Sequence, residues 1–174
     1  MSKSFVIAAL ERLADAKKRS PDELSRELRE VCLKSTDRKL LRQLIAEGAS
    51  VNTACRGQLP LWNACRRREP SFAQILIESS ADVNALSDEG HCAFVTSCMN
   101  GNLQVMRALL AAGASINICD EESGCTGLYA AAMQGRCEIV MFLSLRGASR
   151  TAHMRSDSEF MDAELPELLE RELR

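Results

Sequence analysis

The side chains of this chain that could do chemistry are its cysteines, its histidines and a few runs of like charge. There are eight cysteines and two histidines in 174 residues. Such a set raises three possibilities: a disulfide framework, a zinc site and a catalytic pair of cysteine and histidine. Each of these needs a particular arrangement of side chains, so the spacing along the chain is the first test.

The spacing favours none of the three. No Cys-x-x-Cys pair occurs, and only His91 and His153 are available to complete a zinc site. Cys92 directly follows His91, and the side chains of sequence neighbours usually point apart, so a reactive pair is not expected. We therefore expect reduced thiols at small apolar positions, with no metal and no cofactor. Reduced cysteines are typical of proteins of the cytoplasm or the nucleus.

Two runs of charge have both a bland and a functional interpretation. Arg66-Arg67-Arg68 suits the solvated end of a helix, and it also suits recognition of an acidic partner. The acids at 120–122 lack the spaced oxygen ligands of a calcium site, so we expect a solvated loop tip there.

Composition excludes several classes of protein. The net charge is −2, which gives little attraction for nucleic acid or for an anionic membrane surface. No apolar run approaches the roughly 18–20 residues of a membrane span. The first apolar run is interrupted at once by Glu11 and Arg12, so a signal peptide is not expected. The chain contains no phosphate-binding glycine loop, zinc motif or catalytic triad, and we expect no enzymatic activity.

The elements that must position these residues recur with a nearly fixed period. Gly57, Gly90 and Gly124 follow one another at intervals of about 33 residues. The segment 113–117, Gly-Ala-Ser-Ile-Asn, has counterparts one period earlier, at 80–84, and one period later, at 147–149. Two apolar runs with helical periodicity lie within each period. This pattern indicates a stack of helix–turn–helix units.

The units resemble the ankyrin repeat. The turn signature of that family, Gly-x-Thr-Pro-Leu-His, appears in degenerate form at 57–62, 90–95 and 124–129. No repeat keeps the signature histidine, and Trp62 stands in its place in one of them, where we expect it to pack. The resemblance covers about residues 20–152 and implies an all-α, ankyrin-type solenoid of about four repeats, with hairpin-like turns and terminal capping helices.

The expected organisation has three parts. An amphipathic helix in 1–19 would shield the end of the stack or dock a partner, and 153–174 would form an acidic capping helix or tail. The motif Ser20-Pro21-Asp22-Glu23 predicts a capped helix start for the first repeat. The repeats between the two ends are expected at 20–52 (a capping repeat), 53–85, 86–118 and 119–152.

The resemblance also implies a function, which is the binding of another protein in the concave groove of the stack. Turn tips and the exposed sides of the first helices line such a groove. One end of it is expected to be basic and the other acidic. The residues expected to contact a partner are Arg56, Gln58, Asn63, Arg66, Arg67, Asp88, Glu89, His91, Met99, Asn100, Glu121, Glu122, Cys125, Met133 and Gln134.

Three functions are compatible with this interpretation. The first is a non-catalytic adaptor or scaffold that needs only a groove, and the second is a stoichiometric inhibitor of a partner enzyme such as a kinase. The third is a redox enzyme, which would need a cysteine of lowered pKa. The partner is expected to be a protein rather than nucleic acid or a membrane, and the chain is expected to be a monomer.

Asn84 is a candidate modification site. With Leu76 and the residues at 82–84 it resembles the pattern of leucine, acid, valine and asparagine that asparaginyl hydroxylases use in ankyrin-like repeats. The alternative is an asparagine that stabilises its turn and is never modified.

Overall fold

The computed structural model describes residues 19–149 apart from 36, 68 and 69. The helix expected before residue 19 and the acidic segment 153–174 lie outside these residues. The helices of the described part are α2 (Pro21–Lys34), α3 (Arg38–Ala46), α4 (Pro60–Cys65), α5 (Pro70–Glu78), α6 (Ala93–Met99), α7 (Leu103–Ala111), α8 (Gly127–Met133) and α9 (Cys137–Leu145).

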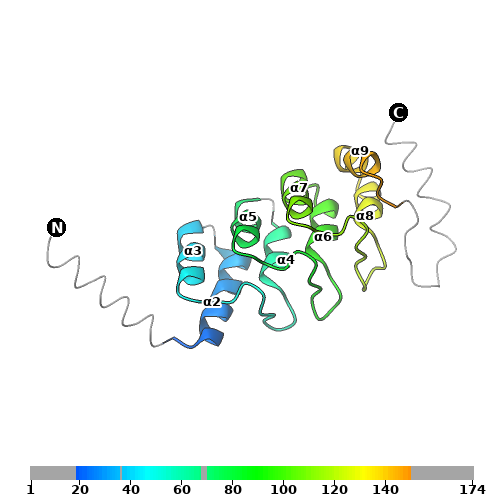
Figure 1. Cartoon of the computed structure of the whole chain (residues 1–174). Coiled ribbons are helices and arrows are strands. Elements are labelled where there is room, and N and C mark those ends of the chain that lie inside the picture. The colour runs from blue at the N-terminus through cyan, green and yellow to red at the C-terminus, as the bar shows by residue number, and fades with distance from the viewer. Residues whose placement is uncertain (1–18, 36, 68–69, 150–174) are drawn as a thin grey trace, which may run out of the picture.

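The helices stand in two rows that run along the molecule (Figure 1). The inner row consists of α2, α4, α6 and α8, each in contact with the next, and the outer row of α3, α5, α7 and α9 packs against it. Hairpin-like turns project beyond the inner row. Isolated β-bridges join the two arms of these turns. The all-α, ankyrin-type solenoid expected from the sequence is confirmed.

The helices begin where the capping residues predict. Ser20 accepts a hydrogen bond from the N–H of Glu23, whose carboxylate in turn accepts from the N–H of Ser20, so the predicted capping box is present. Cys92 takes the capping place before α6 that Thr126 holds before α8. The sulfur of Cys92 accepts from the N–H of Val95 at 3.5 Å, which explains how a cysteine replaces the usual threonine.

The two rows bury their side chains differently. The outer helices bury one face each, as in α7, where Val105, Met106 and Leu109 are inward. The inner helices α4, α6 and α8 are covered on almost every side, and in α8 every residue from Gly127 to Ala132 is buried. A single apolar core therefore runs from the first described repeat to the last.

Asparagines tie each repeat to the next at the ends of the outer helices. In each case the side-chain oxygen accepts a hydrogen bond from a backbone N–H of the following repeat, at 2.8–2.9 Å. The pairs are Asn52 with Asp82, Asn84 with Ser115, and Asn117 with Ser149. These bonds supply the turn-stabilising role that is the alternative for Asn84, while its hydroxylation stays a prediction.

The turns are also bonded to one another at their tips. The N–H of Asp88 donates to the carbonyl of Gly57, and the N–H of Glu121 donates to that of Gly90, both at 2.9 Å. Gly90 has a φ of +83°, and a Cβ there would lie 2.6 Å from the Cβ of Glu121. A side chain at this position would force the two turns apart.

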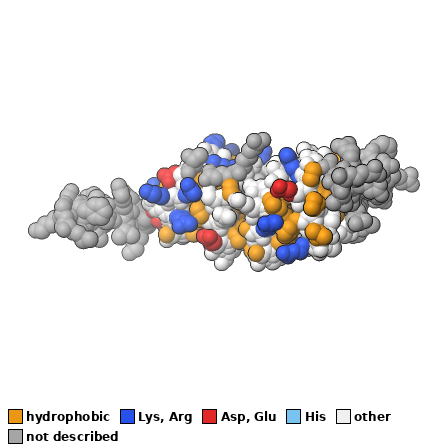
Figure 2. Space-filling view, turned by 90° about the horizontal axis from the view of Figure 1, so that it is seen from above, with side chains coloured by type: hydrophobic (Ala, Val, Ile, Leu, Met, Phe, Trp, Pro, Cys, Tyr) orange, Lys and Arg blue, Asp and Glu red, His pale blue; other side chains and the backbone are white. Residues whose placement is uncertain are grey.

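The outer row presents hydrophobic side chains among arginines and lysines. Figure 2 looks onto this row, where hydrophobic groups gather toward the end that carries α9. Met141 and Leu145 of α9 are 48% and 85% exposed. Among the described residues, no helix combines the length and the hydropathy that crossing a bilayer requires.

Replacing Gly127 with alanine tests how closely the inner helices are packed. A Cβ at this position would lie 2.7 Å from Cε1 of Phe94 and 2.9 Å from the sulfur of Cys98, both on α6. Alanine is favoured over glycine in an open helix by about 1 kcal/mol. Here we expect Gly127→Ala to lower the free energy of unfolding by about 1–3 kcal/mol, because the core is overpacked. Urea denaturation of the wild type and the variant measures this difference in the free energy of unfolding.

A second variant separates the steric clash from other effects of the substitution. Trimming the ring in Phe94→Leu should make the loss caused by Gly127→Ala smaller than in the wild-type background, since the two sites are in contact. Equal losses in both backgrounds, or a gain in stability from Gly127→Ala alone, would contradict close packing of α6 on α8.

Candidate functional site

A hollow of about 680 Å³ lies over the inner helices α4, α6 and α8 and the turns that precede α6 and α8. We call it the groove pocket. Eight of the residues expected to contact a partner line it, and they come from three consecutive repeats: Arg66, His91, Met99, Asn100, Glu122, Cys125, Met133 and Gln134. The structure thus brings together side chains that are far apart in the chain, from Arg66 at one end of this set to Gln134 at the other.

An aromatic pair forms one wall of the groove pocket. The ring of His91 stacks on that of Trp62, with centroids 5.0 Å apart and planes at 8°. The indole N–H of Trp62 donates to Oγ1 of Thr96 at 3.0 Å. The guanidinium of Arg66 lies over the same indole, 5.0 Å from its centroid. Trp62 is 7% exposed, so it packs as expected and also forms part of the wall.

Carboxylates surround the histidine ring on its polar edges. Nδ1 of His91 is 3.1 Å from Oδ2 of Asp120, and Nε2 is 2.9 Å from Glu122 and 3.4 Å from Glu89. Oδ1 of Asp120 accepts from the N–H and the hydroxyl of Ser123.

The structure bears on two expectations about this acidic turn, the solvated loop tip and the absence of a metal. Asp120 is 5% exposed, so the run 120–122 is not a wholly solvated loop tip: its first acid is folded inward, where His91 and Ser123 bind it. Ligand atoms of His91, Asp120 and Glu122 lie within 4.8 Å of one another, close enough to share a cation. Both carboxylates already lie within 3.1 Å of a ring nitrogen of His91, and the expectation of no metal stays a prediction.

The centre of the groove pocket is apolar. Met99 and Met133 are 42% and 48% exposed there, beside the buried Tyr129 and Val95. Unbranched methionine side chains adapt to irregular shapes, and exposed ones are common at surfaces that bind peptides. The lining of the pocket therefore combines adaptable apolar side chains with Arg66 and with the carboxylates of Asp120 and Glu122.

Asn63 is a correction to the sequence analysis. We expected it to contact a partner, but its side chain is fully buried within α4. Neither atom of its amide has a hydrogen-bond partner in the part of the chain that the structure describes. The reason is that both neighbouring inner helices, α2 and α6, pack against α4, which leaves its polar residue no route to solvent.

Arg67 is a second correction. We expected its side chain to face the groove, but its Nη1 donates to the carbonyls of Val31, Cys32 and Ser35 at the end of α2. Its guanidinium also lies 4.7 Å from the ring centre of Phe72. The free carbonyls at a helix C-terminus attract a cation, and they hold Arg67 away from the groove.

The remaining expected contact residues lie on the turns. Arg56 is exposed, but it lines a different pocket from Arg66, so the three arginines 56, 66 and 67 do not form one basic site. Asp88, Glu89 and Glu121 are exposed at the bonded turn tips, and Gln58 is half-buried.

Sequence reasoning missed several residues of these sites. Thr96 and Tyr129 occupy positions that the repeat pattern assigns to the core, and nothing local indicates that they also border a pocket. Arg26 and Arg29 of α2 line the other pocket, together with Arg56. The spacing of Arg26 and Arg29 could have indicated a basic surface, because residues at i and i+3 of a predicted helix lie on one face.

The four buried cysteines are poor candidates for catalysis. All eight lie among the described residues, and none forms a disulfide there. Burial raises the pKa of the Cys32 and Cys92 thiols to about 12 and raises the pKa of Cys65 and Cys98 even more. Cys92, the neighbour of His91, is thus held as the protonated thiol and is no nucleophile near neutral pH.

Comparison with known proteins finds relatives built from the same repeat. A family model described as "Ankyrin repeats (3 copies)" matches residues 30–120 and 71–153. The chain is 33% identical over 124 residues to the mouse B-cell lymphoma 3 protein homolog, a match that covers 68% of this chain and 28% of that protein. It is 33% identical over 94 residues to human ankyrin repeat and SOCS box protein 16, covering 54% of this chain and 21% of that protein.

A bacterial protein shows similar identity. Protein PhlB of Serratia liquefaciens is 36% identical over 84 residues, which are 48% of this chain and 37% of PhlB. The matched segments therefore span less than two fifths of the length of each of these three relatives.

The burial of the thiols predicts the order in which they react. In the native protein near pH 7.5, Cys137 should react first with a thiol reagent because it is exposed. Cys32, Cys65, Cys92 and Cys98 should stay unmodified, since they are buried and protonated. After denaturation without reductant, all eight should react. Mass spectrometry of the labelled peptides gives the order, and rapid labelling of the buried four in native protein would show that the core does not protect them.

Proposed function

The chain belongs to the ankyrin-repeat family, and on that basis we propose that it is a non-catalytic binding module whose protein partner occupies the groove pocket. Ankyrin repeats are generally modules of protein–protein interaction. The observation that carries the proposal is the composition of the groove pocket, in which three repeats contribute exposed methionines, an aromatic wall and charges of both signs.

The chemistry of the pocket fits a protein segment. Apolar side chains of a partner would supply affinity by covering Met99 and Met133, which are half-exposed in the free chain. Arg66 on one side and Glu122 on the other would fix the orientation of the segment through complementary charges. Exposed ion pairs are individually weak, so the apolar centre is where we expect most of the binding free energy.

We further propose an adaptor role, which needs only a binding groove; the alternative is a stoichiometric inhibitor, which would bind the catalytic domain of a partner enzyme. Assaying a captured enzyme with and without the chain tests this choice. The cytoplasmic or nuclear location and the monomeric state are parts of the same proposal, and cell fractionation and light scattering test them.

The double variant Met99→Glu/Met133→Glu tests the groove pocket directly. Because both side chains are half-exposed, the melting temperature should change little. Placing carboxylates at the apolar centre should weaken binding at least tenfold, which is about 1.4 kcal/mol. Partners would be captured from a cell extract with the wild-type chain and identified by mass spectrometry, and their affinity for each variant would then be measured with purified protein.

Met141 provides the matched control. It is a methionine with the same 48% exposure as Met133, but it lies on α9 in the outer row. Met141→Glu should keep the affinity of the wild type. If this variant loses the partner while the groove variant keeps it, the binding surface is the outer row and the proposal is wrong.

A further inference from the structure

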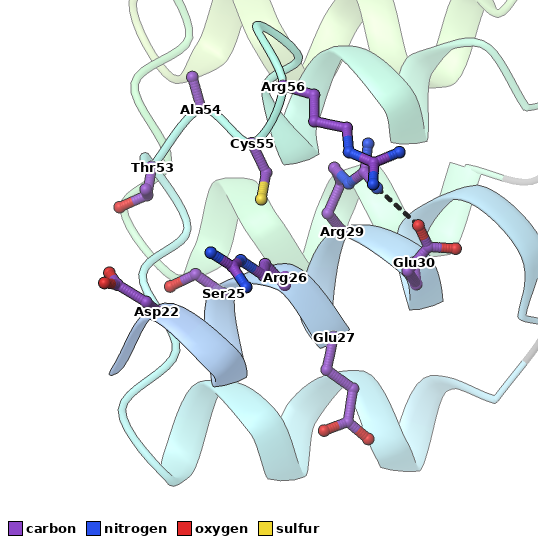
Figure 3. A pocket seen from close by; sticks show the side chains of 10 residues that line it. All are labelled: Asp22, Ser25, Arg26, Glu27, Arg29, Glu30, Thr53, Ala54, Cys55 and Arg56. Atoms are coloured by element: carbon purple, nitrogen blue, oxygen red, sulfur yellow. Dashed lines mark hydrogen bonds and ion pairs between the residues drawn. The ribbon is translucent and has the colours of Figure 1, made fainter. Parts of the chain in front are cut away.

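A second pocket, of about 660 Å³, lies between α2 and the turn that leads into α4 (Figure 3). We call it the N-terminal pocket. Three of the side chains that line it are arginines: Arg26 and Arg29 from α2, and Arg56 from the turn. It lies along the same inner row as the groove pocket, one repeat closer to the N-terminus, and shares no lining residue with it.

Arg29 is a charged side chain that folding has taken out of water. The residue is only 8% exposed. Its Nη2 donates to Glu30 at 2.6 Å, and its buried Nε has no partner within the described residues. The side chains of Arg56 and Arg29 both belong to the lining of the pocket, and they overlap in the view of Figure 3. Guanidinium groups that line one pocket repel each other, and a bound anion would offset that repulsion.

Two of the three carboxylates of this pocket are also paired with bases outside it. Glu27 pairs with Arg19 at 2.9 Å, and it points away from the arginines in Figure 3. Glu30 also pairs with Lys34 at 2.8 Å, and that ammonium lowers the pKa of the Glu30 carboxyl. Asp22 is the third acid of the lining. The lining thus holds three arginines and three carboxylates, and two of the carboxylates, Glu27 and Glu30, also pair with bases outside it.

The position of Arg56 is unfavourable for its backbone. Arg56 and Gly57 form a two-residue turn between Cys55 and Gln58, which exchange backbone hydrogen bonds of 3.0 and 3.3 Å. Both central residues have positive φ, 54° for Arg56 and 75° for Gly57. Such turns favour asparagine followed by glycine. A long side chain in the left-handed region costs free energy, and strain of this kind is common where a side chain has a function.

We propose that the N-terminal pocket is an oxyanion site that takes a phosphate monoester carried by a side chain of a bound protein. A phosphate monoester has a charge of about −1.5 to −2 near pH 7, whereas a carboxylate carries one, so the phosphate interacts more strongly with three guanidinium groups. Its three terminal oxygens accept hydrogen bonds from several guanidinium forks at once. The site deepens the proposed function, because its position along the inner row would let it hold one end of a segment that also covers the groove pocket.

The experiment uses the full chain and three probes: a pentapeptide with one phosphoserine among alanines, the same peptide with serine, and the same peptide with glutamate. Titration is followed by the NMR signals of the arginine Nε–H groups and by calorimetry. The phosphopeptide should bind saturably and shift the signals of Arg26, Arg29 and Arg56. Equal affinity for the glutamate or serine peptide would overturn the phosphate assignment. Inorganic phosphate binding as tightly as the phosphopeptide would overturn the assignment to a protein side chain.

Arg56→Asn separates a ligand role from a structural one. Asparagine suits this turn, so the melting temperature should rise, while the affinity for the phosphopeptide should fall at least tenfold. Arg26→Gln should also lower the affinity, and Arg42→Gln on α3, an exposed arginine outside the pocket, should not. A more stable Arg56→Asn protein that keeps the full affinity would exclude Arg56 as a ligand and overturn the proposal.

These experiments test the N-terminal pocket and the groove pocket independently of each other. The groove variant Met99→Glu/Met133→Glu should bind the phosphopeptide as the wild type does, because neither methionine lines the N-terminal pocket. Loss of phosphopeptide binding in that variant would mean that the probe sits in the groove pocket, and the oxyanion site would be wrong. If the groove variant loses a protein partner but still binds the phosphopeptide, the result supports binding of the partner in the groove pocket and leaves the oxyanion site in place.

Discussion

Every contact between repeats in this protein requires that one inner helix stacks closely on the next. On α8 the position facing α6 is a glycine, Gly127, with Phe94 and Cys98 directly against it. The distance between packed helices follows the size of the side chains between them. Small residues on the inner row therefore fix the spacing of the repeats, and the asparagine bonds and the bonded turn tips, which join neighbouring repeats, are possible only at that spacing.

The groove pocket is a consequence of that spacing rather than of any one repeat. Each repeat has too few side chains to make a site, but stacking lays the turn of one repeat beside the first helix of the repeat before it. His91 thereby reaches Trp62, and Asp120 reaches His91. The polar partners of His91 and the hydrogen bond from Trp62 to Thr96 hold these side chains in place before any partner arrives, which reduces the entropy lost on binding.

The arginines show how one residue type serves different purposes in neighbouring positions. Arg67 binds helix-end carbonyls and is part of the scaffold, while Arg66 lies over an indole at the wall of the groove. Arg29 is buried beside Glu30, and Arg56 lines the same pocket from a turn in which its φ is positive. Solvated arginines at a helix end contribute little, but a guanidinium out of water needs compensation, and this difference separates the N-terminal pocket from the rest of the basic surface.

Patterns in the sequence were enough to predict the period, the helix pairs, the capping box at Ser20 and the exposure of Met99 and Met133, because local periodicity and capping chemistry act over a few residues. The positions of Asn63 and Arg67, in contrast, follow from tertiary packing alone. Helices covered on nearly all sides have no polar face for a pattern to reveal, so the burial of Asn63 left no signal. The carbonyls that bind Arg67 belong to the preceding repeat, and such contacts exist only once the repeats are stacked.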